Sequence, residues 1–280
     1  MIDTENRMVE LVDRALLGPA LPVWSYTRAY FHWKKFRNVR ALFKNAIRKM
    51  SGPVKVLDVG CGFGQYVFAL DREFGKERKL EFQGVDIDPV NLYCCGLKKD
   101  KYKADNVSFG LGNAESLAFA DGSFDIIIST ELLEHLKEPG RALAEFYRVL
   151  KPDGTAIITT PNDSNMVVRL KNMFGRIFRR KTSDRMNEAD SEASKAEYRK
   201  VGFGHISVKG LREWIRILSD SGFKTEHIKR GSLLLGTPRQ DVKRVIAGLF
   251  ILAEVILDRL PFLRNLSEDV ILGARKRNQP

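Results

Sequence analysis

The stretch VKVLDVGCGFG, residues 54–64, decides the fold of this 280-residue chain. Its first six residues form a short apolar run rich in β-branched side chains, which is typical of a buried strand. Gly60, Gly62 and Gly64 then allow positive φ angles and a close approach of a ligand to the backbone. A helix is expected from Gln65 to about Phe74, and its free N-terminal amides would point toward the same ligand. The segment predicts an α/β fold with a nucleotide-like ligand at this turn, and a packing turn without a ligand is the alternative.

The spacing of the glycines argues against a dinucleotide site. That fingerprint needs glycine at the first, third and sixth positions, and the sixth position here is Gln65. The next strand is expected over LEFQGVDI, residues 80–87, and it carries Asp86 near its carboxyl end. A carboxylate there can accept hydrogen bonds from both hydroxyls of a ribose. The alternative role, a helix N-cap, suits Asp88 better because Asp88 directly precedes Pro89.

The pattern DVGCGFG, residues 58–64, resembles motif I of the class I S-adenosylmethionine-dependent methyltransferases. Further segments follow in the order of that family as far as residue 162. They are a strand over 107–112 with Asn113-Ala114-Glu115, an Asp-Gly turn at 121–122 before a fourth strand, the sequence ELLEH at 131–135, an amphipathic helix over 141–150 and a fifth strand over 155–160. The resemblance implies an α/β fold with a Rossmann-like, seven-stranded sheet, mostly parallel, with helices on both faces. The last strand, expected over 269–277, would be antiparallel and inserted between the fifth strand and a sixth strand near 223–229.

The resemblance also implies the cofactor S-adenosyl-L-methionine, which becomes S-adenosyl-L-homocysteine. In the family the residue at Asp86 binds the ribose and the residue at Ile87 packs on the adenine. The family usually has Asp where this chain has Asn113, whose amide oxygen can still accept a hydrogen bond from the adenine amino group. The complete set of expected cofactor-binding residues is Asp58, Gly60, Cys61, Gly62, Gly64, Gln65, Asp86, Ile87, Asn113, Ala114 and Glu131.

Glu131, Glu134 and His135 form an E-x-x-E-H motif just past the fourth strand. It resembles a motif of the ubiquinone-pathway O-methyltransferases and of the small-RNA 3′-terminal 2′-O-methyltransferases, where it binds a divalent metal. In the RNA enzymes a later histidine completes the site, and His205 sits at a comparable point. Three interpretations stay open: a metal site of Glu131, Glu134, His135 and His205, His135 as a metal-free catalytic base, or a structural role.

The chain is expected to fold as one methyltransferase domain, residues 51–280, preceded by an N-terminal helical arm, residues 1–50. Residues 163–204 are predicted to form a basic lid insertion over the acceptor. Residues 238–263 are predicted to form an amphipathic helix before the last strand. Its apolar stripe favours core or dimer packing, so the chain is expected to be a monomer or a homodimer. Contact of residues 242–263 with a membrane surface is the alternative.

The formal net charge of +12 lies mainly outside the cofactor motifs. Residues 1–50, for example, carry 10 Lys and Arg against 4 Asp and Glu. Such surfaces favour anionic partners, either membrane head groups or nucleic acid, although solvation of exposed helices explains any single cluster equally well. The chain has no recognisable RNA-binding module, so nucleic acid is the less expected partner. Three cysteines form neither a disulfide framework nor a zinc pattern, which predicts a cytoplasmic, reducing environment.

The sequence therefore predicts a methyltransferase that acts on oxygen of a small or lipid-linked acceptor. An RNA 2′-O-methyltransferase is the first alternative, favoured by the positive charge and the E-x-x-E-H motif. A cofactor-binding protein that has lost catalysis is the second alternative.

Overall fold

The computed structural model describes residues 26–75, 79–163, 206–232, 252–254, 256–257, 259–260 and 267–277. The predicted lid over 163–204 lies outside the described residues except for Asp163, and His205 lies outside them as well. The same holds for most of the predicted helix over 238–263. In the described part of the chain, no helix is long and apolar enough to cross a membrane.

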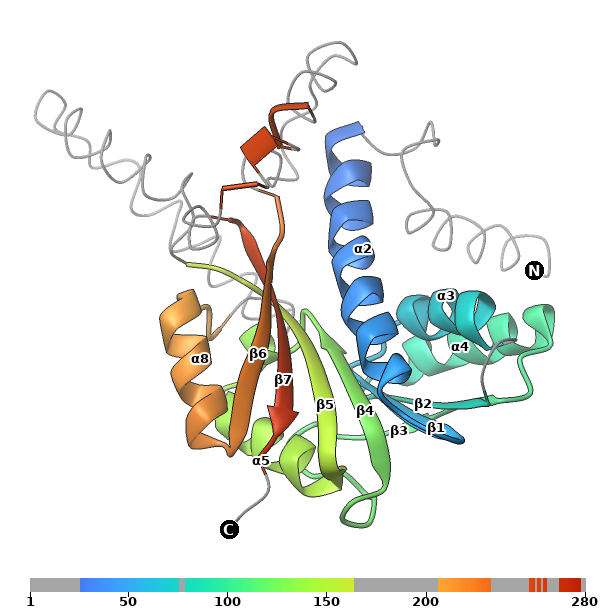
Figure 1. Cartoon of the computed structure of the whole chain (residues 1–280). Coiled ribbons are helices and arrows are strands. Elements are labelled where there is room, and N and C mark those ends of the chain that lie inside the picture. The colour runs from blue at the N-terminus through green and yellow to red at the C-terminus, as the bar shows by residue number, and fades with distance from the viewer. Residues whose placement is uncertain are drawn as a thin grey trace, which may run out of the picture.

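The described residues contain a seven-stranded sheet in the order β3-β2-β1-β4-β5-β7-β6. Its strands are β1 (Val54–Val59), β2 (Leu80–Asp86), β3 (Val107–Leu111), β4 (Phe124–Thr130), β5 (Leu150–Pro161), β6 (Phe223–Arg230) and β7 (Asp269–Lys276). Strands β1 to β5 pair in parallel, and β7 is antiparallel to both β5 and β6. The sheet confirms the predicted Rossmann-like fold, including the insertion of the last strand between the fifth and the sixth (Figure 1).

Helices cover both faces of the sheet (Figure 1). They are α2 (Tyr26–Arg48), α3 (Gln65–Phe74), α4 (Pro89–Tyr102), α5 (Pro139–Val149) and α8 (Leu211–Asp220), with a short 3-10 helix η1 (Leu133–His135) after β4. Successive strand residues point to opposite faces, so Ile126 and Ile128 pack with α2 and α3. Ile127 packs with α5 and α8 on the other side. The fully buried Val39 and Phe43 make α2 part of the core.

Two elements, the fifth strand and the helix before it, begin earlier than predicted. The fifth strand was predicted to begin at residue 155 but begins at Leu150. Leu150 was predicted to be the last residue of the helix before it. Leu150 pairs with Phe124, and the register then shifts before Thr155 pairs with Ile126. The turn-like residues between Leu150 and Thr155 therefore form an irregularity within the strand. Helix α5 begins at Pro139 rather than Arg141, because proline suits the first turn of a helix.

Gly222 and Gly140 give a matched test of this packing. Gly222 has a φ of 88°, and a Cβ there would lie 2.6 Å from Cε2 of Tyr147. Gly140 lies in α5, and a Cβ there would meet nothing within 4 Å. We expect Gly222→Ala to lower the free energy of unfolding by about 1–3 kcal/mol, and Gly140→Ala to raise it by about 0.5–1 kcal/mol. Urea unfolding of both variants measures this difference, and equal midpoints would show that the Gly222 turn is not strained.

Candidate functional site

The glycine turn after β1 is anchored to the end of β2. The N–H groups of Gly60 and Cys61 both donate to the carbonyl oxygen of Val85, at 2.8 and 3.0 Å. Gly60, Gly62 and Gly64 have positive φ angles of 71°, 52° and 69°, which glycine allows. The turn is therefore a fixed structure that only glycine adopts without strain.

The glycines of this turn meet different surroundings. A Cβ at Gly60 would lie 2.9 Å from Cδ1 of Leu132, so Gly60 lets the segment after β4 pack onto the turn. A Cβ at Gly62 would meet nothing within 4 Å among the described residues. Gly62 thus leaves its backbone accessible to a ligand, and the glycine turn and the segment after β4 are direct neighbours.

Asp86 joins the glycine turn to the start of α4. One carboxylate oxygen accepts the N–H of Gly62 at 2.8 Å, and the other accepts the N–H of Asp88 at 2.9 Å and the Nδ2 group of Asn91 at 3.2 Å. Asp88 is the N-cap of α4 and accepts the N–H of Val90 at 2.8 Å. The structure thus separates the two roles weighed for these residues, because Asp88 caps the helix and Asp86 lies against the glycine turn.

An exposed apolar rim borders Asp86. Ile87 follows β2 directly and is 73% exposed, and Leu111, which ends β3 in register with Asp86, is 70% exposed. Val90 and Tyr93 on α4 add to this rim. Ile87 was predicted to contact the ligand, whereas the other three were not singled out. Their signal in the sequence is weak, because apolar residues at strand ends and in helices ordinarily pack inside.

Asn113 and Cys61 use their side chains within the protein. Oδ1 of Asn113 accepts the N–H of Glu115 at 2.9 Å and closes a turn, so only its second lone pair and its NH₂ group face further partners. The thiol of Cys61 is buried, and its pKa is raised chiefly by a hydrogen bond to Cys95 and by burial. Any ligand contact of Cys61 therefore falls to its backbone. Ala114 is buried, and Gln65 is the first residue of α3.

Asp58 is a buried carboxylate in β1. Its side chain is 1% exposed, and neither oxygen has a hydrogen-bond partner in the described part of the chain. Burial, together with repulsion by Asp86, raises the pKa of Asp58 to about 8. A buried acid without a partner is costly, and a positively charged group brought near it would relieve that cost.

Glu131 follows β4 and adopts a left-handed backbone conformation with a φ of 52°. Its N–H donates to the carbonyl oxygen of Thr159 at 3.1 Å. The hydroxyl of Thr159 donates to Oε1 of Glu131 at 2.8 Å, and Nζ of Lys35 lies 2.8 Å from Oε2. Both carboxylate oxygens are thus held, while about a third of the side chain remains exposed.

Glu134 and His135 differ from Glu131 in their burial and their contacts. Glu134 is fully buried, its carboxylate has no hydrogen-bond partner within the described segments, and burial with repulsion by Glu131 raises its pKa to about 8. Its carbonyl oxygen accepts the N–H groups of Ile206 and Ser207. The side chain of His135 is 30% exposed, and its Nε2 lies 3.9 Å from Oε1 of Glu134.

These residues do not fit the predicted metal site. The carboxylate of Glu131 is bound by Lys35 and Thr159, and that of Glu134 is enclosed in the protein. Among the described residues there is no group of three or more His, Cys, Asp and Glu that could hold a metal ion. His205, the fourth predicted ligand, lies outside the described residues. The metal interpretation therefore has no support in this part of the chain.

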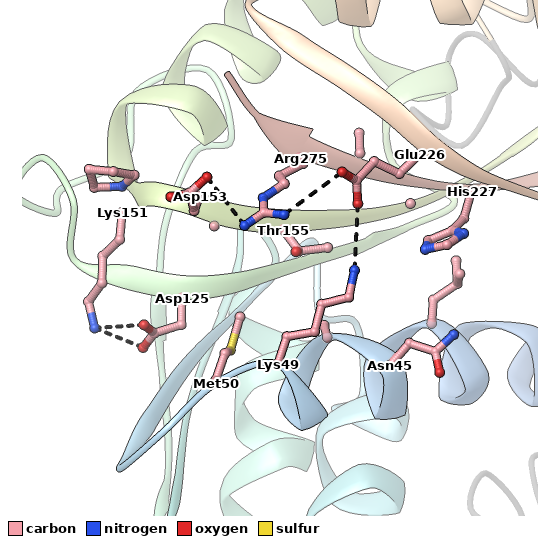
Figure 2. Close-up of a pocket in the computed structure, with 16 residues that line it drawn as sticks. Asn45, Lys49, Met50, Asp125, Lys151, Asp153, Thr155, Glu226, His227 and Arg275 are labelled. Carbon is pink, nitrogen blue, oxygen red and sulfur yellow. Dashed lines mark hydrogen bonds and ion pairs between the residues drawn. The ribbon is translucent and has the colours of Figure 1, made fainter. Parts of the chain in front are cut away.

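A separate hollow of about 170 Å³ lies at the opposite edge of the sheet (Figure 2). It is lined by the C-terminal end of α2, the start of β4 and β5, and parts of β6 and β7. Its charged side chains are paired with one another, as in the contacts of Lys151 with Asp125 at 2.8 Å and of Arg275 with Asp153 at 3.3 Å. Open α/β sheets bind ligands at the carboxyl ends of their strands, and this hollow lies at the amino ends of β4 and β5. We therefore assign the functional site to the edge that carries the glycine turn.

The raised pKa of Asp58 makes stability depend on pH. The folded chain keeps a proton on Asp58 up to about pH 8, whereas the unfolded chain releases it near pH 4. Between these values the folded state binds more protons, so this group lowers the free energy of unfolding as the pH rises, by at most about 1.4 kcal/mol per unit. Asn is uncharged throughout, so we expect the stability of Asp58→Asn relative to the wild type to increase from pH 5 to pH 8.

Thermal unfolding of both proteins across this pH range measures the effect. Asp105→Asn, at an exposed aspartate, is the control and should track the wild type. A difference between Asp58→Asn and wild type that does not change with pH would show that Asp58 is ionised in the folded chain.

Comparison with known proteins places this geometry in a family. Residues 57–158 match the family model described as a methyltransferase domain. Norajmaline N-methyltransferase of Rauvolfia serpentina is 28% identical over 115 residues, which cover 41% of this chain and 38% of the plant enzyme. Demethylmenaquinone methyltransferase of Renibacterium salmoninarum is 28% identical over 144 residues, 51% of this chain and 56% of that enzyme. The chain thus aligns with 38% of the length of the plant enzyme and 56% of the length of the bacterial one.

A solved structure extends the likeness of the fold over almost the whole chain. The [4+2]-cyclase SpnF superposes with a TM-score of 0.60 at 19% identity, covering 99% of this chain and 95% of that one. At this identity the likeness shows the fold alone, whereas the matching segment 57–158 contains the glycine turn, Asp86 and the E-x-x-E-H motif. Residues 57–158 of this chain are therefore a methyltransferase domain, and the described sheet has the fold of the class I S-adenosylmethionine-dependent methyltransferases.

Proposed function

We propose that this protein transfers a methyl group from S-adenosyl-L-methionine to an oxygen atom of a small or lipid-linked acceptor. The observation that carries the proposal is the arrangement at the carboxyl edge of β1, β2 and β4. An accessible glycine turn, a ribose-type carboxylate and an exposed apolar rim lie there, and the segment after β4 carries a partly exposed histidine.

The residues at this edge fit the parts of the cofactor. Asp86 would accept the ribose hydroxyls, and Ile87 would lie against the flat adenine. Gly62 leaves the backbone open to the amino-acid portion. S-adenosyl-L-methionine carries a positive charge at its sulfonium and at its amino group, and Asp58 and Asp86 make this part of the protein acidic. A cationic ligand is therefore the kind of molecule that this site would stabilise.

When bound, the cofactor supplies a methyl group that is activated by the positive sulfur. The protein must hold the acceptor in line with that methyl group and take up the proton that an attacking hydroxyl loses. His135 is the residue we assign to this proton, because its side chain is partly exposed and imidazole is the side chain that most often serves as a general base. Nε2 of His135 lies 3.9 Å from Oε1 of the buried Glu134.

The similar proteins do not by themselves identify the acceptor of the methyl group. One relative is named as an N-methyltransferase of norajmaline and the other as a methyltransferase of demethylmenaquinone, so their names do not agree on one accepting atom. An RNA acceptor remains the alternative that the net charge of +12 favours. A protein that binds the cofactor without catalysis is separated from both by incubation with methyl-labelled cofactor and either a lipid extract or RNA, because only an enzyme moves the label into one of these acceptors.

Near the C-terminus, apolar side chains are exposed and a charged side chain is buried, and this arrangement favours a lipid-linked acceptor. Leu252, Ile256 and Leu260 lie at spacings of four and are 59%, 58% and 37% exposed. Glu254 between them is fully buried, where Nζ of Lys34 lies 2.6 Å from its carboxylate and the Ser232 hydroxyl donates to it at 2.8 Å. The charged side chain therefore faces inward and the apolar ones outward. Together with the basic charge of the chain, this face suits the surface of an anionic membrane.

Loss of the Asp86 carboxylate should abolish tight cofactor binding. Asp86→Asn keeps the shape of the side chain but removes the charge and one acceptor oxygen. Two hydrogen bonds to a charged group contribute about 1.5–3 kcal/mol each, so we expect the Kd for S-adenosyl-L-homocysteine to rise by about 100-fold or more. Isothermal titration calorimetry measures the Kd, with the exposed Asp105→Asn as control. Unchanged affinity of the Asp86 variant would contradict the cofactor assignment.

The apolar face should bind anionic lipid. We expect the wild type to sediment with phosphatidylcholine vesicles that contain phosphatidylglycerol. Replacement of Leu252, Ile256 and Leu260 by Gln should weaken this partitioning by about tenfold or more, because three apolar side chains lose their burial in the interface. Tyr102→Gln, at an exposed residue of α4, is the control. Equal sedimentation of all three proteins, or binding of RNA with a steep salt dependence instead, would exclude the lipid surface.

A further inference from the structure

Helix α2 carries two consecutive lysines, Lys34 and Lys35, and both are buried, with 1% and 3% exposed. A buried lysine is costly unless carboxylates pair with it. Lys34 pairs with Glu254, as described above. Lys35 lies between two carboxylates, with its Nζ 2.8 Å from Oε2 of Glu131 and 3.0 Å from Oδ2 of Asp269. The two neighbouring side chains therefore tie α2 to different parts of the protein.

Lys35 spans the carboxyl edge of the sheet. Glu131 directly follows β4, and Asp269 is the first residue of β7, paired with Pro161 at the end of β5. The ammonium group also lies 4.6 Å from the ring centroid of Phe31, one helical turn earlier. Burial acts to lower the pKa of Lys35, but the attraction of Asp269 and Glu131 outweighs it and the pKa is raised. Lys35 is therefore a fixed positive charge.

Glu131 is held in one orientation by these contacts. Its left-handed backbone is a conformation that costs about 1–3 kcal/mol and persists only where the surroundings enforce it. Thr159 binds its N–H and one carboxylate oxygen, and Lys35 binds the other oxygen. A Cβ at Gly60 would lie 2.9 Å from Cδ1 of Leu132, the residue after Glu131, so the segment that carries Glu131 packs against the glycine turn.

We propose that Lys35 is a positioning residue of the cofactor site, which acts by fixing the Glu131 carboxylate beside the glycine turn. The inference rests on the proposed function, because Glu131 matters there only if that turn holds the cofactor. It makes α2, a helix outside the segment 57–158 that matches the family model, a contributor to cofactor binding. A purely structural lysine would be dispensable here, because well-packed apolar side chains often replace buried ion pairs without loss of stability.

A double-mutant cycle on cofactor affinity tests the proposal. Lys35→Met removes the ammonium group, and Glu131→Gln removes the carboxylate charge that it holds. We expect each to weaken binding of S-adenosyl-L-homocysteine by about tenfold or more, and the double variant to bind no more weakly than the worse single variant. The control is the double variant Lys34→Met with Glu254→Gln, which removes an equally buried ion pair of the same helix. It should leave the affinity for S-adenosyl-L-homocysteine within about twofold of the wild type.

The outcomes separate this inference from the proposed function. If the wild type itself fails to bind S-adenosyl-L-homocysteine, the proposed function is overturned. If the wild type binds but Lys35→Met retains its affinity, or its effect multiplies with that of Glu131→Gln, the positioning role is overturned. Should Lys35→Met fail to fold, Lys35→Met with Asp269→Asn also removes the charge of the buried partner, so that only the partly exposed Glu131 loses its ammonium partner. The same loss of affinity is expected of that variant, and retained affinity would overturn the role.

Discussion

The hydrogen bonds of the Asp86 carboxylate are the interaction on which the carboxyl edge of the sheet depends. Strands β1 and β2 run in parallel register, with Val59 opposite Val85, so the connections after both strands emerge at one edge. Asp86 then binds Gly62 in the first connection and Asp88 in the second. One carboxylate thus sets the position of the glycine turn relative to α4. A ligand at the turn meets an acceptor that is already oriented, which lowers the cost of ordering on binding.

Elements whose signals are local could be predicted from the sequence. The β-branched run, the three glycines and the helix after them gave β1, the turn and α3 with their bounds, and the proline after Asp88 gave the cap of α4. The position of β7 came from the resemblance to a family, since nothing local in residues 269–276 distinguishes an antiparallel strand from a parallel one. The start of β5 was placed too late. Its first residues contain Pro152 and Gly154, which normally mark turns, and pairing of Leu150 with Phe124 overrides that preference.

The roles within the E-x-x-E-H motif could not be predicted from its spacing. Spacing places side chains only if the backbone conformation is known, and here a left-handed residue is followed by a single 3-10 turn. Glu131 therefore points to Lys35 while Glu134 is enclosed in the core. Lys35 itself had no signal, because a lysine in a helix is ordinarily solvated and its partners, Glu131 and Asp269, are distant in the sequence.

The buried acids explain why this edge is suited to a cationic ligand rather than to a stable core. Asp58, Glu134 and Asp269 all have pKa values raised by burial, to about 8, 8 and 7. Lys35 balances Glu131 and Asp269 but does not bond Asp58, whose oxygens have no partner in the described part of the chain. Each of these acids costs stability near neutral pH, and apolar residues would pack at lower cost. A positively charged ligand near Asp58 would favour its ionised form. Binding of that ligand would therefore recover part of the stability that the buried acids cost.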